Sequence, residues 1–468
     1  MRTTPRHFAR TALGASILAL TLAVGPALAD SIFTPTASGF VGAVSAAAVE
    51  RGAPIHPGSE VTITGDRLPP GQQITLMRGN TVLNADGPLT VDAEGKISFS
   101  LTVDADAATG IQPIVVIAEN PAAAMVLDLK VSPDIPLSGE EGFTVESKPV
   151  TRGLYQVAYS AKSDALFVTS AVGRPPVAES SLMKLDPATL EVVASVTPGA
   201  APARPDGSDG GVFAIYGLDV DDVNGNVWVS VTRQNTATVY RQDDLSLVKQ
   251  FDVGTVAHPR DVLVDEARGR VYFSTSFDPE IAVFDAATLA PLDPITIPST
   301  LRRETFGARS LQQDSASGKL FSVSISTPEV AIIDPDSGAV RVLALPNLRA
   351  GSDAAYDAQD GLIFVVGQDS DNLLIVSEET GTVLHDVAVG ANPLSVAFDP
   401  DSRLAYVAVR GADTLTVVNP QGEIVANLDG GSYPNQVRVL ENGIFAINKS
   451  RGADDARGDR ISHITPVQ

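Results

Sequence analysis

Hydrophobic and polar residues alternate with a period of two along much of the chain, the pattern of β-strands with one buried face. Between residues 30 and 138 the alternating runs are short and separated by turn residues; examples are residues 58–65, 96–101 and 113–117. A Leu-Pro-Pro-Gly corner at residues 68–71 follows the first of them. Strands and turns at this spacing predict a small antiparallel β-sandwich over residues 30–138.

From residue 139 to residue 468 the pattern repeats itself. Each unit has an apolar strand that ends near an Asp, a tight turn, a very apolar second strand, a loop, a third strand that ends in Asp or Asn, and a fourth strand. The residues that close the first strands follow one another at intervals of 41 to 61 positions and are Ser160, Asp221, Asp265, Asp314, Asp357, Asp399 and Leu440. Seven such units predict a seven-bladed β-propeller, and therefore an all-β protein.

The last unit is one strand short, because residues 444–448 and 461–465 supply only its second and third strands. Residues 142–147 alternate in the same way and precede the first complete unit. We expect this segment to be the outer strand of the last unit, which would close the ring and leave no open sheet edge.

The second strands of the units resemble a known repeat. Phe167-Val168-Thr169-Ser170, Val227-Trp228-Val229-Ser230 and Val271-Tyr272-Phe273-Ser274 are similar to the YVTN β-propeller repeat, and the turn at residues 334–338 resembles the turn that follows it. Residues 141–468 resemble the YncE-like group of exported bacterial propellers, and residues 58–65 resemble a strand of bacterial Ig-like domains. The resemblance implies an exported binding protein, with nucleic-acid binding reported for some members and no family-wide activity.

The first 29 residues have the features of a secretory signal peptide. Arg2, Arg6 and Arg10 precede an apolar run from residue 11 to 24, and Ala27-Leu28-Ala29 supplies small residues before a cleavage site. We expect cleavage after Ala29 and a mature protein in the periplasm or outside the cell. The apolar run is shorter than the roughly 20 residues of a membrane-spanning helix.

Charge and cysteine content narrow the possible functions. The chain has 33 Lys and Arg against 56 Asp and Glu, a net charge of −23, which disfavours bulk binding of nucleic acid or anionic membranes. It has no cysteine, which excludes disulfide scaffolds, thiolate metal sites and a cysteine nucleophile. No cofactor is expected, and we expect a monomer.

Arginines are frequent in the loops that enter the first strands and in those that join second to third strands. These loops share one face of a propeller, where the axial channel opens. The candidate ligand-binding residues on that face are Arg174, Arg233, Arg260, Arg309, Arg349, Arg410 and Arg451. Arginine clusters bind carboxylates and phosphates through paired hydrogen bonds. Acidic residues occupy the same loops, so the alternative is an ordinary charged surface. Two longer loops, residues 171–180 and 198–213, are expected to be flexible, solvated insertions.

The sequence therefore favours a non-catalytic exported scaffold that binds an anionic small molecule, a polymer or a protein. One alternative is a lactonase-type hydrolase with a channel metal, for which Asp219, Asp261, Asp353 and His258 are candidates. Another is an accessory subunit of an envelope electron-transfer or uptake system. The chain has no Gly-x-Ser-x-Gly elbow and no phosphate-binding glycine loop, and it has one tryptophan, which argues against a quinone dehydrogenase.

Overall fold

The computed structural model describes residue 36 and residues 39–467, so the predicted signal peptide lies outside the described residues. The described chain is built from β-strands and two single-turn 3₁₀ helices, η1 (Glu140–Gly142) and η2 (Thr232–Gln234). No helix among the described residues is long and apolar enough to cross a membrane.

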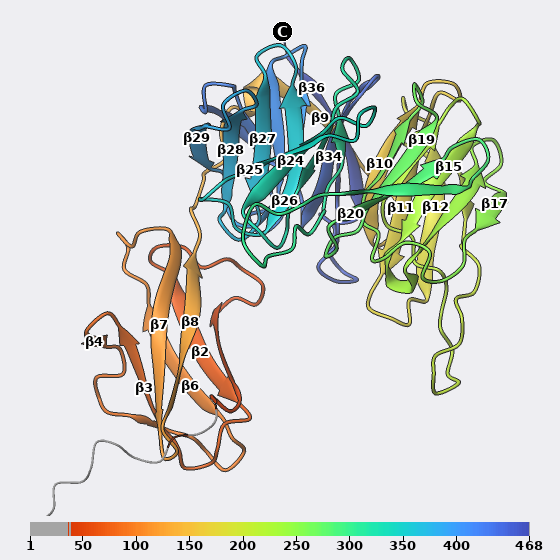
Figure 1. Cartoon of the computed structure of the whole chain (residues 1–468). Coiled ribbons are helices and arrows are strands. Elements are labelled where there is room, and N and C mark those ends of the chain that lie inside the picture. Colours follow the sequence, from red (N-terminus) through yellow and green to blue (C-terminus); the bar gives the residue numbers. More distant parts are fainter. Residues whose placement is uncertain (1–35, 37–38, 468) are drawn as a thin grey trace, which may run out of the picture.

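Residues 43–131 form two antiparallel sheets (Figure 1, red to orange). One sheet has the order β1 (Ala43–Ala48), β2 (Glu60–Asp66), β6 (Ile97–Thr102). The other has the order β4 (Thr81–Val82), β3 (Gln73–Arg78), β7 (Gly110–Glu119), β8 (Ala123–Val131), with β5 (Leu89–Thr90) also on β3. The alternation seen in the sequence becomes a buried inner face, on which Val61, Ile63, Ile74 and Val116 are all fully buried.

The chain from residue 143 onward forms seven four-stranded antiparallel sheets within the described residues. The first three are β10 (Leu154–Ser160), β11 (Ala165–Val172), β12 (Glu179–Leu185), β13 (Val192–Val196); β14 (Leu218–Asp221), β15 (Asn226–Val231), β16 (Thr236–Arg241), β17 (Leu247–Gln250); and β18 (Val262–Asp265), β19 (Arg270–Ser274), β20 (Glu280–Asp285), β21 (Pro291–Thr296). The next two are β22 (Gln312–Gln313), β23 (Leu320–Val323), β24 (Glu329–Ile333), β25 (Val340–Ala344); and β26 (Gly351–Asp357), β27 (Leu362–Gly367), β28 (Asn372–Ser377), β29 (Val383–Ala388). The last two are β30 (Pro393–Asp399), β31 (Leu404–Val409), β32 (Thr414–Val418), β33 (Ile424–Asp429); and β34 (Pro434–Leu440), β35 (Gly443–Asn448), β36 (Arg460–Pro466), β9 (Phe143–Pro149).

The pairing predicted between the two ends of this region is present. β9 runs antiparallel to β36, with Val145 opposite Ile464. A hydrophobic cluster joins the first sheet to the last, and it contains Leu154 and Val168 from one sheet and Phe445 from the other. A similar hydrophobic cluster lies between the two members of every other pair of successive sheets, so the seven sheets form a closed circuit.

The two long loops of the first repeat differ from the expectation of flexible insertions. Val177 is 1% exposed, and its backbone forms a β-bridge with Gly211, which joins the two loops. Val177 packs with Ala171, Ala214 and Tyr216 in a small hydrophobic cluster beside the first sheet. This hydrophobic cluster fixes the loops in the structure. It was not apparent in the sequence, because the loops are rich in proline and glycine.

Both the sandwich and the segment that follows it contact the seven sheets. Lys130 Nζ at the end of β8 lies 2.8 Å from Asp371 Oδ1, whose side chain is 5% exposed. The side-chain amide of Asn427 donates to the carbonyl of Ile135 at 2.8 Å. The backbone of Ser138 pairs with that of Asn427 as well. These contacts hold the sandwich close to the β27–β28 and β32–β33 sides of the circuit.

Candidate functional site

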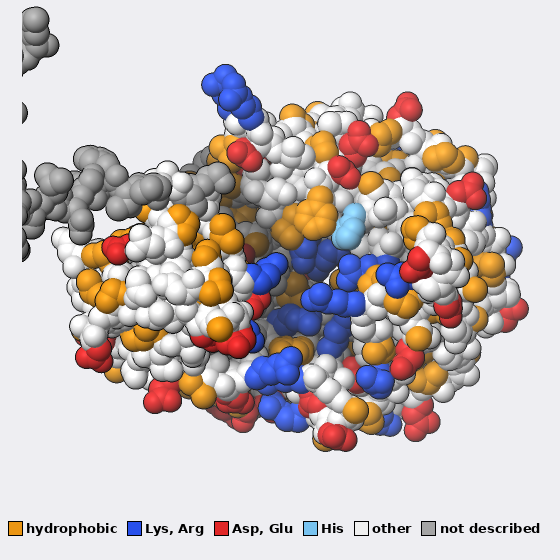
Figure 2. All heavy atoms as spheres, turned by 90° about the horizontal axis from the view of Figure 1, so that it is seen from below, with side chains coloured by type: hydrophobic (Ala, Val, Ile, Leu, Met, Phe, Trp, Pro, Cys, Tyr) orange, Lys and Arg blue, Asp and Glu red, His pale blue; other side chains and the backbone are white. Residues whose placement is uncertain are grey.

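A cavity of about 370 Å³ opens on the face where the arginine-bearing loops meet. Figure 2 shows Lys and Arg side chains gathered in and around this hollow, while Asp and Glu lie mostly toward the outer edge. The basic, histidine and tyrosine side chains that line the cavity are Arg152, Tyr155, Tyr216, Arg233, His258, Arg260, Arg309, Lys449 and Arg451.

The repeat itself places the cavity residues. Hydroxyl groups near the ends of the second strands donate to the carbonyls that precede the first strand of the next sheet. Ser230 Oγ lies 2.8 Å from the carbonyl of Arg260, and Ser274 Oγ lies 2.9 Å from that of Arg309. At Gly217 an added Cβ would stand 2.0 Å from the Arg260 carbonyl, so only glycine permits this close approach of neighbouring sheets. The backbones of both arginines are therefore fixed by polar contacts between sheets.

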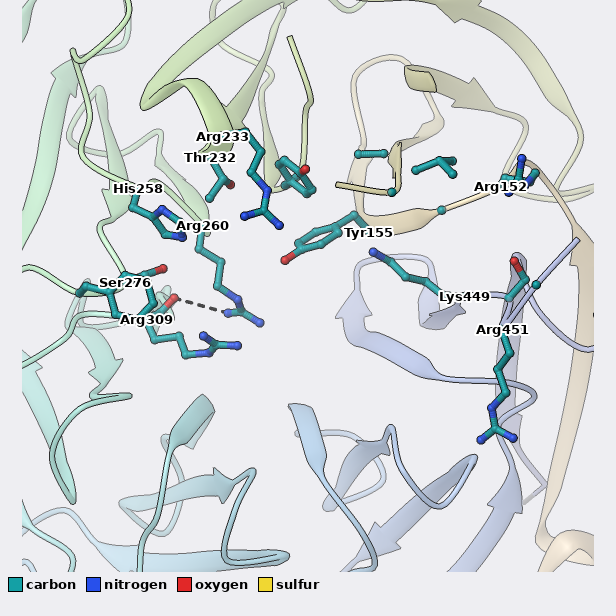
Figure 3. A pocket seen from close by; sticks show the side chains of 18 residues that line it. Arg152, Tyr155, Thr232, Arg233, His258, Arg260, Ser276, Arg309, Lys449 and Arg451 are labelled. Carbon is teal, nitrogen blue, oxygen red and sulfur yellow. Dashed lines mark hydrogen bonds between the residues drawn. The ribbon is translucent and has the colours of Figure 1, made fainter. Parts of the chain in front are cut away.

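Arg260 and Arg309 lie side by side at the inner part of the cavity (Figure 3). Arg260 is 9% exposed, and its Nη1 lies 3.3 Å from Asp261 Oδ1. The Nε groups of both arginines are buried and have no hydrogen-bond partner among the described residues. Burial and the neighbouring Arg260 lower the pKa of Arg309 to about 10. Two adjacent guanidiniums with unused donors form a site that an anion would stabilise.

Two further cations, Arg233 and Lys449, extend the positive charge toward the mouth, and His258 lies near them. Arg233 comes from η2 and lies 6.0 Å over the ring of Tyr216. Lys449 follows β35 directly, and its Nζ lies 4.1 Å from the ring centroid of Tyr155. His258 has its pKa lowered by burial and by Arg233 and Arg309, which keeps its imidazole neutral at neutral pH.

The cations of the cavity fall into two groups. Arg152 is 3.4 Å from Glu179, Arg451 is 2.8 Å from Asp413, and Arg260 is paired with Asp261 as described above. Arg233, Arg309 and Lys449 have no acidic partner at ion-pair distance within the described part of the chain. The cavity therefore carries unneutralised positive charge even though the chain is acidic overall.

The structure brings together only some of the arginines proposed from the sequence. Arg233, Arg260, Arg309 and Arg451 line this one cavity, whereas Arg174 is exposed and is not among its lining residues. Arg349 and Arg410 do not line the cavity either.

Arg349 points away from the cavity and lies 3.6 Å from Asp128 of the sandwich. Arg410 lies behind the rim, donating to Asn435 Oδ1 at 2.7 Å and covering the ring of Tyr433 at 4.9 Å. Arg410 therefore acts on the cavity only through its charge, which helps lower the pKa of Lys449. The sequence did not distinguish these two arginines from those that line the cavity, because their partners, Asp128 and Asn435, come from other segments of the chain.

The cavity also contains residues that the sequence reading missed. Lys449 lies among the arginines, as do Tyr155 and Tyr216, whose rings meet edge to face with their centroids 4.8 Å apart. A readable signal existed for Tyr216. It stands just before a first strand, in the same place in its repeat as Arg260, and lining residues of adjacent repeats meet around the axis.

A second, narrower cavity of about 90 Å³ shares Tyr155 and Arg260 with the first and continues inward. Its charged side chains are Asp261 and Asp353 together with Arg260 and Arg438. Asp261 Oδ1 accepts from Gln156 Nε2 at 2.6 Å, and Asp353 accepts from Ser395 Oγ at 2.8 Å. Burial and the nearby Asp261 raise the pKa of Asp353 to about 6. The inner cavity therefore balances two carboxylates with two guanidiniums, whereas the lining of the outer cavity has basic side chains and no carboxylate.

The four residues considered for a hydrolytic metal do not converge. Asp261 and Asp353 line the inner cavity, His258 lines the outer one, and Asp219 accepts from the backbone N–H of Val264 at 2.8 Å. No group of three or more His, Asp or Glu side chains arranged for a metal ion occurs in the described ranges.

Comparisons with known proteins agree with this architecture. No protein-family model matches the chain. The uncharacterized protein YncE of Salmonella typhimurium is 22% identical over 312 residues, covering 63% of this chain and 82% of that protein, and YncE of Salmonella typhi is 21% identical over the same shares. Among solved structures, Kuenenia stuttgartiensis hydrazine synthase matches with a TM-score of 0.52 and 16% identity, covering 67% of this chain and 96% of the other. The streptogramin B lyase structure matches with a TM-score of 0.52 and 12% identity over 70% of this chain and all of the other. The closed circuit of four-stranded sheets and these likenesses together show a β-propeller that is similar to the YncE proteins, and they support a YncE-like family.

Proposed function

We propose that this protein is an exported binding protein, made of an Ig-like sandwich and a seven-bladed propeller, that captures a small organic or inorganic anion in its axial cavity. The observation that carries the proposal is the pair Arg260 and Arg309, whose buried Nε donors have no partner among the described residues. Those Nε atoms are enclosed, so an anion in the cavity would bind the outer nitrogens of the two guanidiniums and offset the repulsion between these adjacent cations.

The size of the cavity supports a small ligand over a polymer or a protein. A volume of about 370 Å³ is in the range of small-molecule sites, and the cations converge inside it instead of following a groove. Tyr155 and Tyr216 supply an apolar wall beside the arginines. This combination suits a carboxylate or phosphate attached to a compact body.

Calorimetric titration with inorganic phosphate and with succinate tests the proposal. We expect saturable binding to the mature protein that weakens as salt is added. Arg309→Gln should weaken it about tenfold or more, the effect of one charge-assisted contact. Arg349→Gln is the matched control, because this arginine contacts Asp128 outside the cavity. Absence of binding of both anions to the wild type, or equal losses in the two variants, contradicts the proposal.

The proposed export is tested separately. Sequencing the N-terminus of protein recovered from the periplasm or medium should give Asp30 as the first residue, the position after the predicted cleavage at Ala29. An intact Met1 in a cell-associated product would contradict export.

A further inference from the structure

Lys449 differs from the other lysines whose contacts the structure shows. Lys130 and Lys319 are 2.8 and 2.6 Å from carboxylates. Lys162 and Lys249 donate to backbone carbonyls at 2.7 and 3.0 Å. Lys449 lines the cavity and has no hydrogen-bond acceptor for Nζ among the described residues; its contact there is the face of the Tyr155 ring.

The surroundings of Lys449 favour an uncharged amine. Burial, Arg410 and Arg233 lower the pKa of Lys449 to about 7, so that neutral and protonated forms are similarly populated at neutral pH. Asp459 is the acidic group that opposes this shift. Its Oδ1 accepts from the backbone N–H groups of Gly153 and Ser450 at 2.8 and 3.1 Å, so it holds the loop and does not pair with the amine.

A neutral lysine amine beside another cation is a nucleophile toward carbonyl carbon. Figure 3 shows Arg260 and Arg309 reaching into the space from one side and Lys449 facing it from the other, with Tyr155 between them. A ligand that fits both sides carries a carboxylate for the arginines and a carbonyl for the amine. Because the arginines and Lys449 line one cavity, a ligand held by the arginines would meet the amine within a bound complex and not by an encounter in solution.

We propose that Lys449 forms a reversible imine with the carbonyl group of a small 2-oxo carboxylate whose carboxylate is held by Arg260 and Arg309. This inference rests on the proposed anion site. The lone pair of Nζ forms the N–C bond while the carbonyl π electrons move to oxygen. Both amine protons then leave with that oxygen as water, and the N=C double bond remains. The step needs no oxidant or reductant. The Tyr155 hydroxyl lines the same cavity and can donate a proton to the departing oxygen.

Reductive trapping tests the imine directly. The mature protein is incubated with pyruvate and sodium cyanoborohydride at pH 7, and its peptides are mapped by mass spectrometry. We expect one N-(1-carboxyethyl) adduct, in which the former carbonyl carbon of pyruvate carries a hydrogen and the lysine nitrogen in place of its oxygen, on the peptide that contains Lys449. Its rate should exceed that of any exposed lysine by at least about tenfold, because an exposed lysine with a pKa near 10.4 is almost wholly protonated at this pH. Inorganic phosphate should suppress it by occupying the arginines.

Two variants control the experiment. Lys449→Arg keeps a positive charge but removes the nucleophile, and it should lose the adduct while still unfolding cooperatively on heating. Lys249→Arg is the matched control, since Lys249 Nζ also lies over an aromatic ring, 4.3 Å from the centroid of Phe251, but donates to a carbonyl. Its replacement should leave the labelling of Lys449 unchanged.

The outcomes separate this inference from the proposed function. Adducts spread over exposed lysines at rates like that of Lys449, in protein that binds phosphate, would overturn the imine and leave the anion site standing. Labelling of Lys449 that phosphate does not suppress would overturn the assigned role of the arginines. Failure of the wild type to bind any anion would remove the proposed function and this inference together.

Discussion

Replacing Arg309 by glutamine should make the ligand-free protein more stable and its anion binding weaker. Arg309 is partly buried, and neighbouring Arg260 repels it. The carbonyl of Arg309, which accepts from Ser274 Oγ at 2.9 Å, belongs to the backbone and survives the substitution. The variant therefore removes an unpaired charge without removing an observed side-chain contact among the described residues.

The lowered pKa of Arg309 sets the size of this effect. A base whose pKa is lower in the folded state holds its proton less tightly there, and this lowers the free energy of unfolding. The loss of stability is fully present below the folded pKa of about 10 and fades as the pH rises further. Each tenfold change in proton affinity corresponds to about 1.4 kcal/mol, which gives an upper bound of about 3 kcal/mol at neutral pH. Solvent at the open mouth reduces it, so we expect a gain of about 1 kcal/mol in the free energy of unfolding.

Chemical denaturation at pH 7 without added anions measures this gain, and phosphate titration measures the loss of affinity. Arg403→Gln is the informative contrast, because Arg403 forms a bidentate pair with the buried Asp357 and should destabilise the protein by about 3 kcal/mol when removed. If Arg309→Gln destabilises the ligand-free protein to a similar extent, Arg309 has a structural role and the reasoning about an unsatisfied cation is wrong.

Other perturbations test the channel, the domain contact and the closure. The raised pKa of Asp353 lowers the free energy of unfolding by up to about 3 kcal/mol above pH 6, so the wild type should become more stable as the pH falls from about 6 toward 4. Asp353→Asn should flatten this increase, and the melting temperature measured against pH tests it. Lys130→Met should release the sandwich from Asp371 and speed protease cleavage within residues 132–138, whereas an unchanged cleavage rate would show that this ion pair does not restrain the domains. Phe143→Ala removes the edge contact with Tyr406, whose ring centroid is 6.2 Å away, and should lower the free energy of unfolding by about 2 kcal/mol in denaturant; no change would refute a closing role for β9.

Much of the architecture follows from local patterns. The alternation in residues 58–65 becomes β2, and the segment near residue 145 pairs with the segment near residue 464 as its pattern required. Strands and repeat spacing are predictable because each depends on a few neighbouring residues and on burial of one face.

Side-chain placement at the face was less predictable. Arg349 and Arg309 occupy similar positions in the sequence, since each precedes the first strand of a repeat. Arg349, however, forms an ion pair with Asp128 of the sandwich and does not enter the cavity. Lys449 was overlooked because its local sequence does not indicate that the charge of Arg410, in the preceding sheet, acts on its amine. Such relations depend on contacts between distant segments, and a single sequence gives no measure of them.

The acidity of the whole chain and the positive charge of the cavity together favour a compact anion over a long polyanion. At physiological salt, charges farther away than about 8–10 Å are largely screened, so a bound anion interacts mainly with the cavity cations. A long polyanion would place its remaining charges over a surface whose net charge is −23. A compact anion avoids that repulsion and still satisfies the donors of Arg260 and Arg309. The same reasoning predicts that phosphate competes for the cavity and that a long single-stranded oligonucleotide of equal phosphate concentration competes poorly; tighter binding of the oligonucleotide would contradict it.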